Sequence, residues 1–226
     1  LLKLLATLGT ADEAASAQMY EVLYEVLRRA DTGINIGYAI IYECVRTITA
    51  IFPSIALLET AATHISRFVG SENHNLKYLG IKALAAIVQV DQKYALDHQL
   101  LVIDCMEDSD ETLKRKTLEL LFRMTNASNV VFVVDKLLAQ LRATGDAEFR
   151  ASLTERITQL AERYAPDNSW FIRTMNVVFE LGGDLVRADV AHNLMRLIAE
   201  GSGEDEEADT ALRAYAASPH SERRAK

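Results

Sequence analysis

The stretch NHNLKYLGIKALAAIV (residues 73–88) is one of four segments that share a pattern and decide the fold of this chain. Each segment contains an apolar residue followed by a basic one. These pairs recur at intervals of 37, 36 and 37 residues: Leu76-Lys77, Leu113-Lys114, Phe149-Arg150 and Val186-Arg187. Regular self-similarity at such a period is typical of solenoids built from helix pairs, which usually offer a long surface to other proteins.

The apolar positions after each pair keep the same phase. Their spacing of i, i+4, i+8 and i+11 forms one stripe along an α-helix. We therefore expect these landmarks to be buried, above all the third set, between successive helix pairs. The aligned sets are Leu76, Leu113, Phe149 and Val186; Gly80, Thr117, Leu153 and Val190; Leu84, Leu121, Ile157 and Leu194; and Ile87, Met124, Leu160 and Leu197, with a fifth copy upstream at Ile36, Ile40, Cys44 and Thr47.

The landmark helices alternate with helices of a second type. Periodicity and caps predict helices over residues 16–29, 34–51, 55–69, 73–88, 95–106, 111–125, 129–142, 147–164, 168–181 and 184–200. Short polar side chains are placed to cap helix starts at Asn73, Asp110, Ser128, Asp146 and Asp184, and Pro166-Asp167 leads into the helix at 168–181. The run VVFVV (residues 130–134) has a strand-like composition, but its flanks and the repeat phase favour a helix. The prediction is an all-α, right-handed superhelical solenoid of HEAT/armadillo-type helix pairs.

The domain prediction is one solenoid segment over residues 1–200, followed by an acidic loop, a partial helix and a frayed tail over residues 201–226. The chain begins LLKLL without an initiator Met, as a helix cut open would, so we expect a fragment of a longer protein. Five leucines then form an apolar face that no upstream helix covers, which predicts aggregation of the isolated chain: Leu1, Leu2, Leu4, Leu5 and Leu8.

Composition excludes some classes of protein. The net charge of −8 argues against nucleic acid as the main partner, because binding phosphates needs a basic surface. The run Lys114-Arg115-Lys116 is a local exception, to be interpreted either as a solvated helix face or as a site for phosphate or an acidic partner. Cys44 and Cys105 lie in apolar helical stretches and are expected to be reduced and buried. No apolar run is long enough to cross a bilayer, which favours a soluble protein.

The sequence contains no constellation that predicts chemistry, so we expect no enzyme and no catalytic, cofactor-binding or metal site. The Gly201-x-Gly203 pair is followed by acidic residues that would repel a phosphate. Trp170, the only tryptophan, is either an interface anchor or a packing residue at a helix start, and packing is favoured. The histidines are scattered without metal-ligand spacing: His64, His74, His98, His192 and His220.

Several long segments resemble the large adaptins. NIGYAIIYECV (residues 35–45) is similar to a characteristic segment of that family, and ISRF (65–68), NLKYLG (75–80) and VIDCMEDSDETLKRK (102–116) resemble the repeats that follow it. QLAERYAPDNSW (159–170) and FELGGDLVR (179–187) are closer to the epsilon-adaptins, the large subunits of the fourth heterotetrameric adaptor complex, than to the gamma-adaptins. The resemblance covers about residues 1–200.

The resemblance implies a non-enzymatic scaffold subunit of a vesicle-coat adaptor complex. Such a subunit joins a beta-type adaptin trunk, a medium chain and a small chain, and takes part in cargo sorting on the cytoplasmic face of the trans-Golgi network. Its membrane association is peripheral and indirect, through the complex. The alternative is another HEAT-repeat scaffold, such as a karyopherin-like transport receptor, which a ladder of like charges lining every inner helix would favour.

Overall fold

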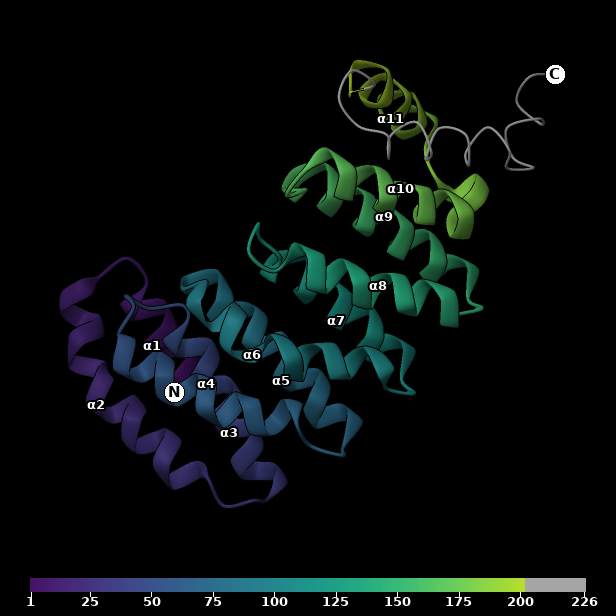
Figure 1. The fold of residues 1–226 in the computed structure, drawn as a ribbon. Coiled ribbons are helices and arrows are strands. Elements are labelled where there is room, and N and C mark those ends of the chain that lie inside the picture. The colour runs from purple at the N-terminus through teal and green to yellow at the C-terminus, as the bar shows by residue number, and fades with distance from the viewer. Residues whose placement is uncertain (202–226) are drawn as a thin grey trace. The chain divides into compact units, whose positions relative to one another are not determined.

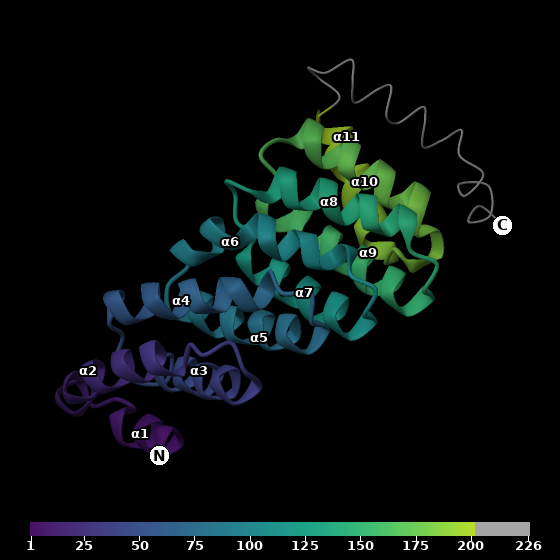
Figure 2. The same cartoon turned by 90° about the horizontal axis from the view of Figure 1, so that it is seen from below.

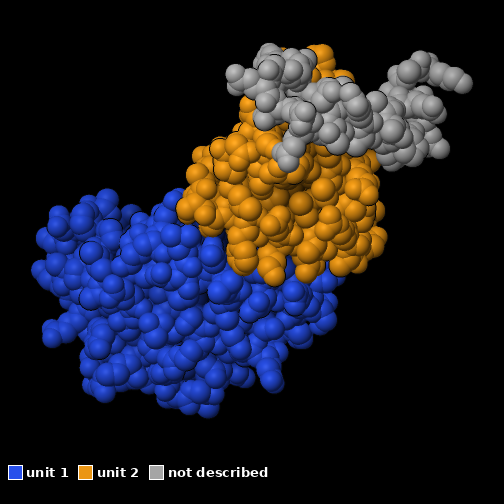
Figure 3. Space-filling model, in the orientation of Figure 1, with its two compact units in different colours: residues 1–124 blue, residues 125–226 orange. Residues whose placement is uncertain are grey.

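The computed structural model describes residues 1–201, apart from the side chains of Ala188, Asn193 and residues 197–201. These residues form two compact units, which divide between Met124 and Thr125 and are coloured separately in Figure 3. The predicted acidic loop, partial helix and tail after residue 201 lie outside the described residues, as does the side chain of Leu197.

The first unit consists of helices in two layers (Figures 1 and 2). After the short α1 (Leu2–Gly9), one layer holds α2 (Glu13–Ala30), α4 (Ile55–Val69) and α6 (Lys93–Asp104). The other holds α3 (Asn35–Ile48), α5 (His74–Val90) and α7 (Glu111–Met124). Contacts run between the layers within each pair and along each layer from one pair to the next. A single 3-10 turn, η1 (Cys105–Glu107), joins α6 to α7.

The second unit repeats this construction. Its described helices are α8 (Val130–Ala143), α9 (Ala147–Tyr164), α10 (Asn168–Gly182) and α11 (Ala188–Gly201), with the 3-10 turn η2 (Gly183–Leu185) before α11. Here α9 packs on both α8 and α10, and α10 packs on α11. The strand-like run at residues 130–134 is helical, as the repeat phase predicted. The prediction of an all-α fold of paired helices is confirmed, and no helix of the described chain is long and apolar enough to cross a membrane.

The landmark positions form the core, as expected. The third set is almost completely buried, with exposures of 0% for Leu84, 1% for Leu121, 0% for Ile157 and 2% for Leu194. In the other sets of the four segments the described members are buried as well, except Leu76, which is half-buried. Burial of this apolar stripe is what stabilises each pair, because a fully buried leucine contributes roughly 2 kcal/mol relative to an exposed one.

The predicted fifth copy of the stripe is correct for two of its four members and wrong in register. Cys44 and Thr47 are buried, but Ile36 and Ile40 are 70% and 38% exposed, and Ile41 is buried instead, so that the register differs by three residues. The reason is a close approach of helices at two glycines. A Cβ at Gly37 would clash with the carbonyl oxygen of Ala30, the last residue of α2, and a Cβ at Gly80 would lie 2.8 Å from the backbone nitrogen of Val69, the last residue of α4. Gly37 is therefore the counterpart of Gly80.

Three of the five predicted caps are confirmed, and Asp167 is a further cap that was not predicted. The side chains of Asn73, Asp110, Asp146 and Asp167 each accept a hydrogen bond from the backbone N–H three residues later, at 3.1, 2.8, 2.5 and 2.6 Å. Each satisfies one of the amides that a helix start leaves without a partner.

The caps predicted at Ser128 and Asp184 are wrong. The Ser128 hydroxyl donates to Asn126 Oδ1 at 2.6 Å within the turn, and α8 begins two residues later. Asp184 lies in the η2 turn, which Gly183 opens with a φ of +51°. The extended Val186 separates that turn from α11, which begins at Ala188, so Asp184 is too far from the helix start to cap it.

Candidate interaction surface

The sequence predicted no catalytic or metal site. No group of three or more His, Cys, Asp or Glu side chains in the described chain could hold a metal ion. His64, His74, His98 and His192 lie on four separate helices, α4, α5, α6 and α11, and His220 lies outside the described residues.

Asp108 is the centre of an ionic cluster in the first unit. Its side chain, only 3% exposed, follows the η1 turn and accepts from Lys77 Nζ at 2.6 Å and from the backbone N–H of Asp110 at 3.0 Å. Lys77 contacts Oδ2, whereas the N–H of Asp110 and His74 Nδ1, at 2.7 Å, both contact Oδ1. Burial alone would raise the pKa of this carboxyl, but the hydrogen bonds from Lys77 and Asp110 and the nearby positive charge lower the pKa to about 2. The cluster holds the start of α5 against the turn between α6 and α7.

Arg150 has the corresponding position in the second unit but different partners. Its guanidinium donates to three backbone carbonyls: Leu141 and Thr144, at the end of α8, and Leu181, near the end of α10, at 2.8, 3.1 and 2.6 Å. Carbonyls at helix ends lack partners within the helix and carry partial negative charge, so a cation is favourable there. The sequence marked Lys77 and Arg150 as repeat landmarks but did not show what they bind.

The basic run at residues 114–116 is largely neutralised. Lys114 pairs with Glu111 at 2.9 Å, and Lys116 pairs with Glu119 at 2.8 Å, each within α7. This arrangement favours the solvated helix face over the phosphate site, because the nearby carboxylates would repel an anion. Trp170 is 9% exposed, just after the start of α10, which favours packing over an accessible anchor.

The two cysteines are free and buried, as predicted. Burial raises the pKa of Cys44 to about 12 and that of Cys105 to about 11. Because the thiolate is the reactive form, neither thiol is suited to redox or nucleophilic chemistry near neutral pH.

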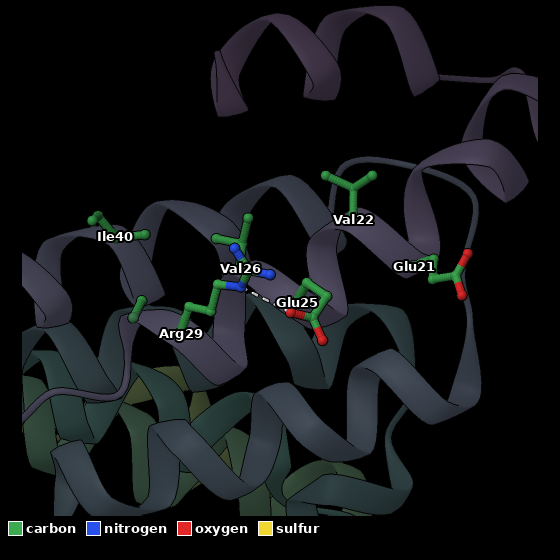
Figure 4. Close-up of a pocket in the computed structure, with 7 residues that line it drawn as sticks. Glu21, Val22, Glu25, Val26, Arg29 and Ile40 are labelled. Atoms are coloured by element: carbon green, nitrogen blue, oxygen red, sulfur yellow. Dashed lines mark hydrogen bonds and ion pairs between the residues drawn. The ribbon is translucent and has the colours of Figure 1, made fainter.

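An open apolar groove of about 540 Å3 lies along α2 and the start of α3 (Figure 4). Val22, Val26 and Ile40 line it, and Val22 is 54% exposed. Glu21 and Glu25 lie beside them, and Glu25 is bound by Arg28 and Arg29 of the same helix. The neighbouring α1 adds exposed apolar side chains at Leu1, Leu4 and Leu8, while Leu2 and Leu5 are half-buried. The sequence did not predict this groove, because the fifth copy of the stripe assigned Ile40 to the core.

Comparison with known proteins gives this architecture a family. The chain matches the family described as "Adaptin N terminal region" over residues 1–215. It is 51% identical over 214 residues to the AP-4 complex subunit epsilon of Arabidopsis thaliana, covering 94% of this chain and 23% of that protein. It is 48% identical over 216 residues to the AP-4 complex subunit epsilon-1 of Homo sapiens, covering 96% of this chain and 19% of that protein.

A more distant relative separates the classes within the family. The AP-1 complex subunit gamma-2 of Arabidopsis thaliana is 32% identical over 198 residues, covering 88% of this chain and 23% of that protein. The order of identities, epsilon before gamma, agrees with the residues that carried the resemblance. The chain spans about a fifth of the length of these relatives, and it belongs to the adaptin N-terminal family.

Proposed function

We propose that this chain is a solenoid segment, over residues 1–200, of the large subunit of an adaptor complex that acts in vesicle-mediated protein transport. The observation that carries the proposal is the identity of about half of all aligned residues with AP-4 epsilon subunits over nearly the whole chain. The paired-helix construction suits such a role, because stacked pairs present extended surfaces to several partners at once. The chain acts as a non-enzymatic scaffold.

The partners we propose are a beta-type adaptin trunk, a medium chain and a small chain. The complex sorts transmembrane cargo on the cytoplasmic face of the trans-Golgi network and on coated vesicles. The net charge of −8 supports indirect, peripheral membrane association, because an acidic subunit does not bind an anionic lipid surface by itself. Co-purification of the full-length subunit with candidate beta, medium and small chains tests this. Recovery of none of them would contradict the adaptor function.

We propose further that residues 129–200 contribute more of the contact with the beta-type trunk than the first half does. A permanent contact of this kind buries on the order of 2,000 Å2 or more. Unit 2 exposes adjacent apolar side chains on α8, at Val131 (41%) and Phe132 (37%), and unit 1 offers a matched pair on α6, at Leu96 (47%) and Leu100 (63%).

These two pairs allow a matched test in the full-length subunit. The double variant Val131→Glu/Phe132→Glu should reduce recovery of the beta trunk at least about tenfold, the effect of roughly 1.4 kcal/mol. Leu96→Glu/Leu100→Glu should leave recovery within about twofold. The positions are exposed, so circular dichroism should show that both variants keep their helices. The opposite result would assign the interface to the first unit.

A further inference from the structure

A small cavity lined by both polar and apolar side chains lies in the second unit between α9 and the segment that leads into α11. Its volume is about 20 Å3, and its lining includes Thr154, Thr158 and Gln159 of α9 with Val186 and Arg187 of the connecting segment. The approach of the two segments is close, because a Cβ at Gly182 would lie 3.2 Å from Thr154 Oγ1 and 3.2 Å from Val186 Cγ2.

The hydroxyl of Thr154 is the reason to expect a ligand here. Thr154 is 1% exposed, and its Oγ1 has no hydrogen-bond partner among the residues that the structure describes. A buried hydroxyl without a partner costs about 1–3 kcal/mol, and nearly all such groups in proteins are satisfied by protein or by water. The side chain lines the cavity, so its partner has room there.

The size of the cavity and the polar side chains at its wall select that partner. A water molecule needs roughly 10–15 Å3 of accessible volume and two to four polar neighbours, so a cavity of about 20 Å3 holds one water and excludes a phosphate or an organic ligand. Two more polar side chains line the cavity, those of Thr158 and Gln159. The Thr158 hydroxyl donates its proton to the Thr154 carbonyl at 2.9 Å, and its oxygen can still accept a hydrogen bond from a water.

We propose that this cavity is a binding site for a single ordered water, which bonds to Thr154 Oγ1 and links α9 to the segment before α11. Such a water links two segments that the landmark cation of this repeat, Arg187, does not join. Arg187, the counterpart of Lys77 and Arg150, pairs instead with Asp189 at 3.1 Å, with both side chains more than half exposed. A water-mediated bond is enthalpically close to a direct one.

The test is a crystal structure of the full chain, alone or in its complex, at a resolution that shows buried waters. We expect density for a water within hydrogen-bond distance of Thr154 Oγ1 in the wild type and in Thr154→Ser, which keeps the hydroxyl. Thr154→Val, which keeps the shape and removes the hydroxyl, should lose it. A dry cavity in the wild type, beside other buried waters that are seen, would overturn the proposal even if both variants failed to fold. Retention of the water in Thr154→Val would remove Thr154 from the site.

Discussion

Unit 1 and unit 2 place a cation at the same point of the repeat and use it in different ways. Lys77 and Arg150 each contact a group 31 residues further along the chain, at 2.6 Å in both cases. In unit 1 that group is the buried carboxylate of Asp108, whereas in unit 2 it is the Leu181 carbonyl, joined by two more carbonyls at the end of α8. The compact ammonium suits one carboxylate, and the wide guanidinium suits several carbonyls.

The difference shows that a sequence repeat fixes where a cation lies but not what it binds. The partner depends on the turn that follows the next helix. In unit 1 the residue that follows the η1 turn is Asp108, whose carboxylate is the partner. In unit 2 the partner is the backbone carbonyl of Leu181, next to Gly182 at the end of α10. The other two landmark cations, Lys114 and Arg187, have partners close by in sequence, Glu111 and Asp189.

The largest effect should come from breaking the ionic cluster of unit 1. Asp108→Ala leaves Lys77 with a side chain that is 22% exposed and no carboxylate. Removing one member of a buried pair costs about 3–5 kcal/mol, and we expect about 3 because Lys77 can partly reach water. Urea unfolding measures the loss. Glu107→Ala, which removes an exposed carboxylate one residue away, is the matched control and should cost less than about 0.5 kcal/mol. A cost below about 1 kcal/mol for Asp108→Ala would contradict the role of the cluster.

The next effect is a dependence on pH that only unit 1 should show. The pKa of Asp108 falls from 3.8 to about 2 on folding, so its stabilising contribution is complete above about pH 5 and is lost as the pH falls toward 2. The gap in unfolding free energy between the wild type and Asp108→Asn should narrow by about 2 kcal/mol from pH 6 to pH 2. Arg150→Met should show a constant gap, because carbonyls do not titrate. A constant gap for Asp108→Asn would mean that its pKa is ordinary.

In unit 2 we expect a loss of about 2 kcal/mol from Arg150→Met, which keeps the apolar stem and removes the donors to three carbonyls. Arg150→Lys should recover part of it, since an ammonium keeps the charge but cannot span all three oxygens. Trp170, the only tryptophan, lies in this unit, so its fluorescence follows unfolding there. Arg142→Met, at an exposed arginine of α8, is the control. Equal stability of Arg150→Lys and the wild type would show that charge alone matters.

Much of this comparison could be predicted from the sequence, and the failures have physical causes. The caps at Asn73, Asp110 and Asp146 were visible because a short polar residue three positions before an apolar landmark meets the local geometry of a helix start. The register of α3 was missed because apolarity does not distinguish Ile40, exposed along the groove, from Ile41, the next residue, which is buried in the core. Gly37 decides between them, but only through contact with Ala30, a feature of packing rather than periodicity.

The contacts of Lys77 and Arg150 and the proposed water site could not be predicted from the sequence. Asp108 looked like one acidic residue among several in a turn, and only the fold brings it to Lys77. Thr154 lies next to the landmark Leu153, and its lack of a partner depends on the path of the segment after Gly182. Contacts between residues about 30 positions apart depend on turn geometry, which a helical period does not specify.

The smallest expected effect is a null one, and it tests whether the two units respond separately. Both cysteines lie in unit 1 and are buried, with the pKa of Cys44 raised to about 12 and that of Cys105 to about 11, so labelling at pH 7.5 requires unit 1 to open. Asp108→Ala should increase the labelling rate by roughly 100-fold, the kinetic equivalent of about 3 kcal/mol. Arg150→Met should leave that rate within about twofold of the wild type while it shifts the Trp170 transition. If Arg150→Met instead accelerates labelling as much as it destabilises unit 2, the units unfold together, and the two cations stabilise one cooperative structure by different chemistry.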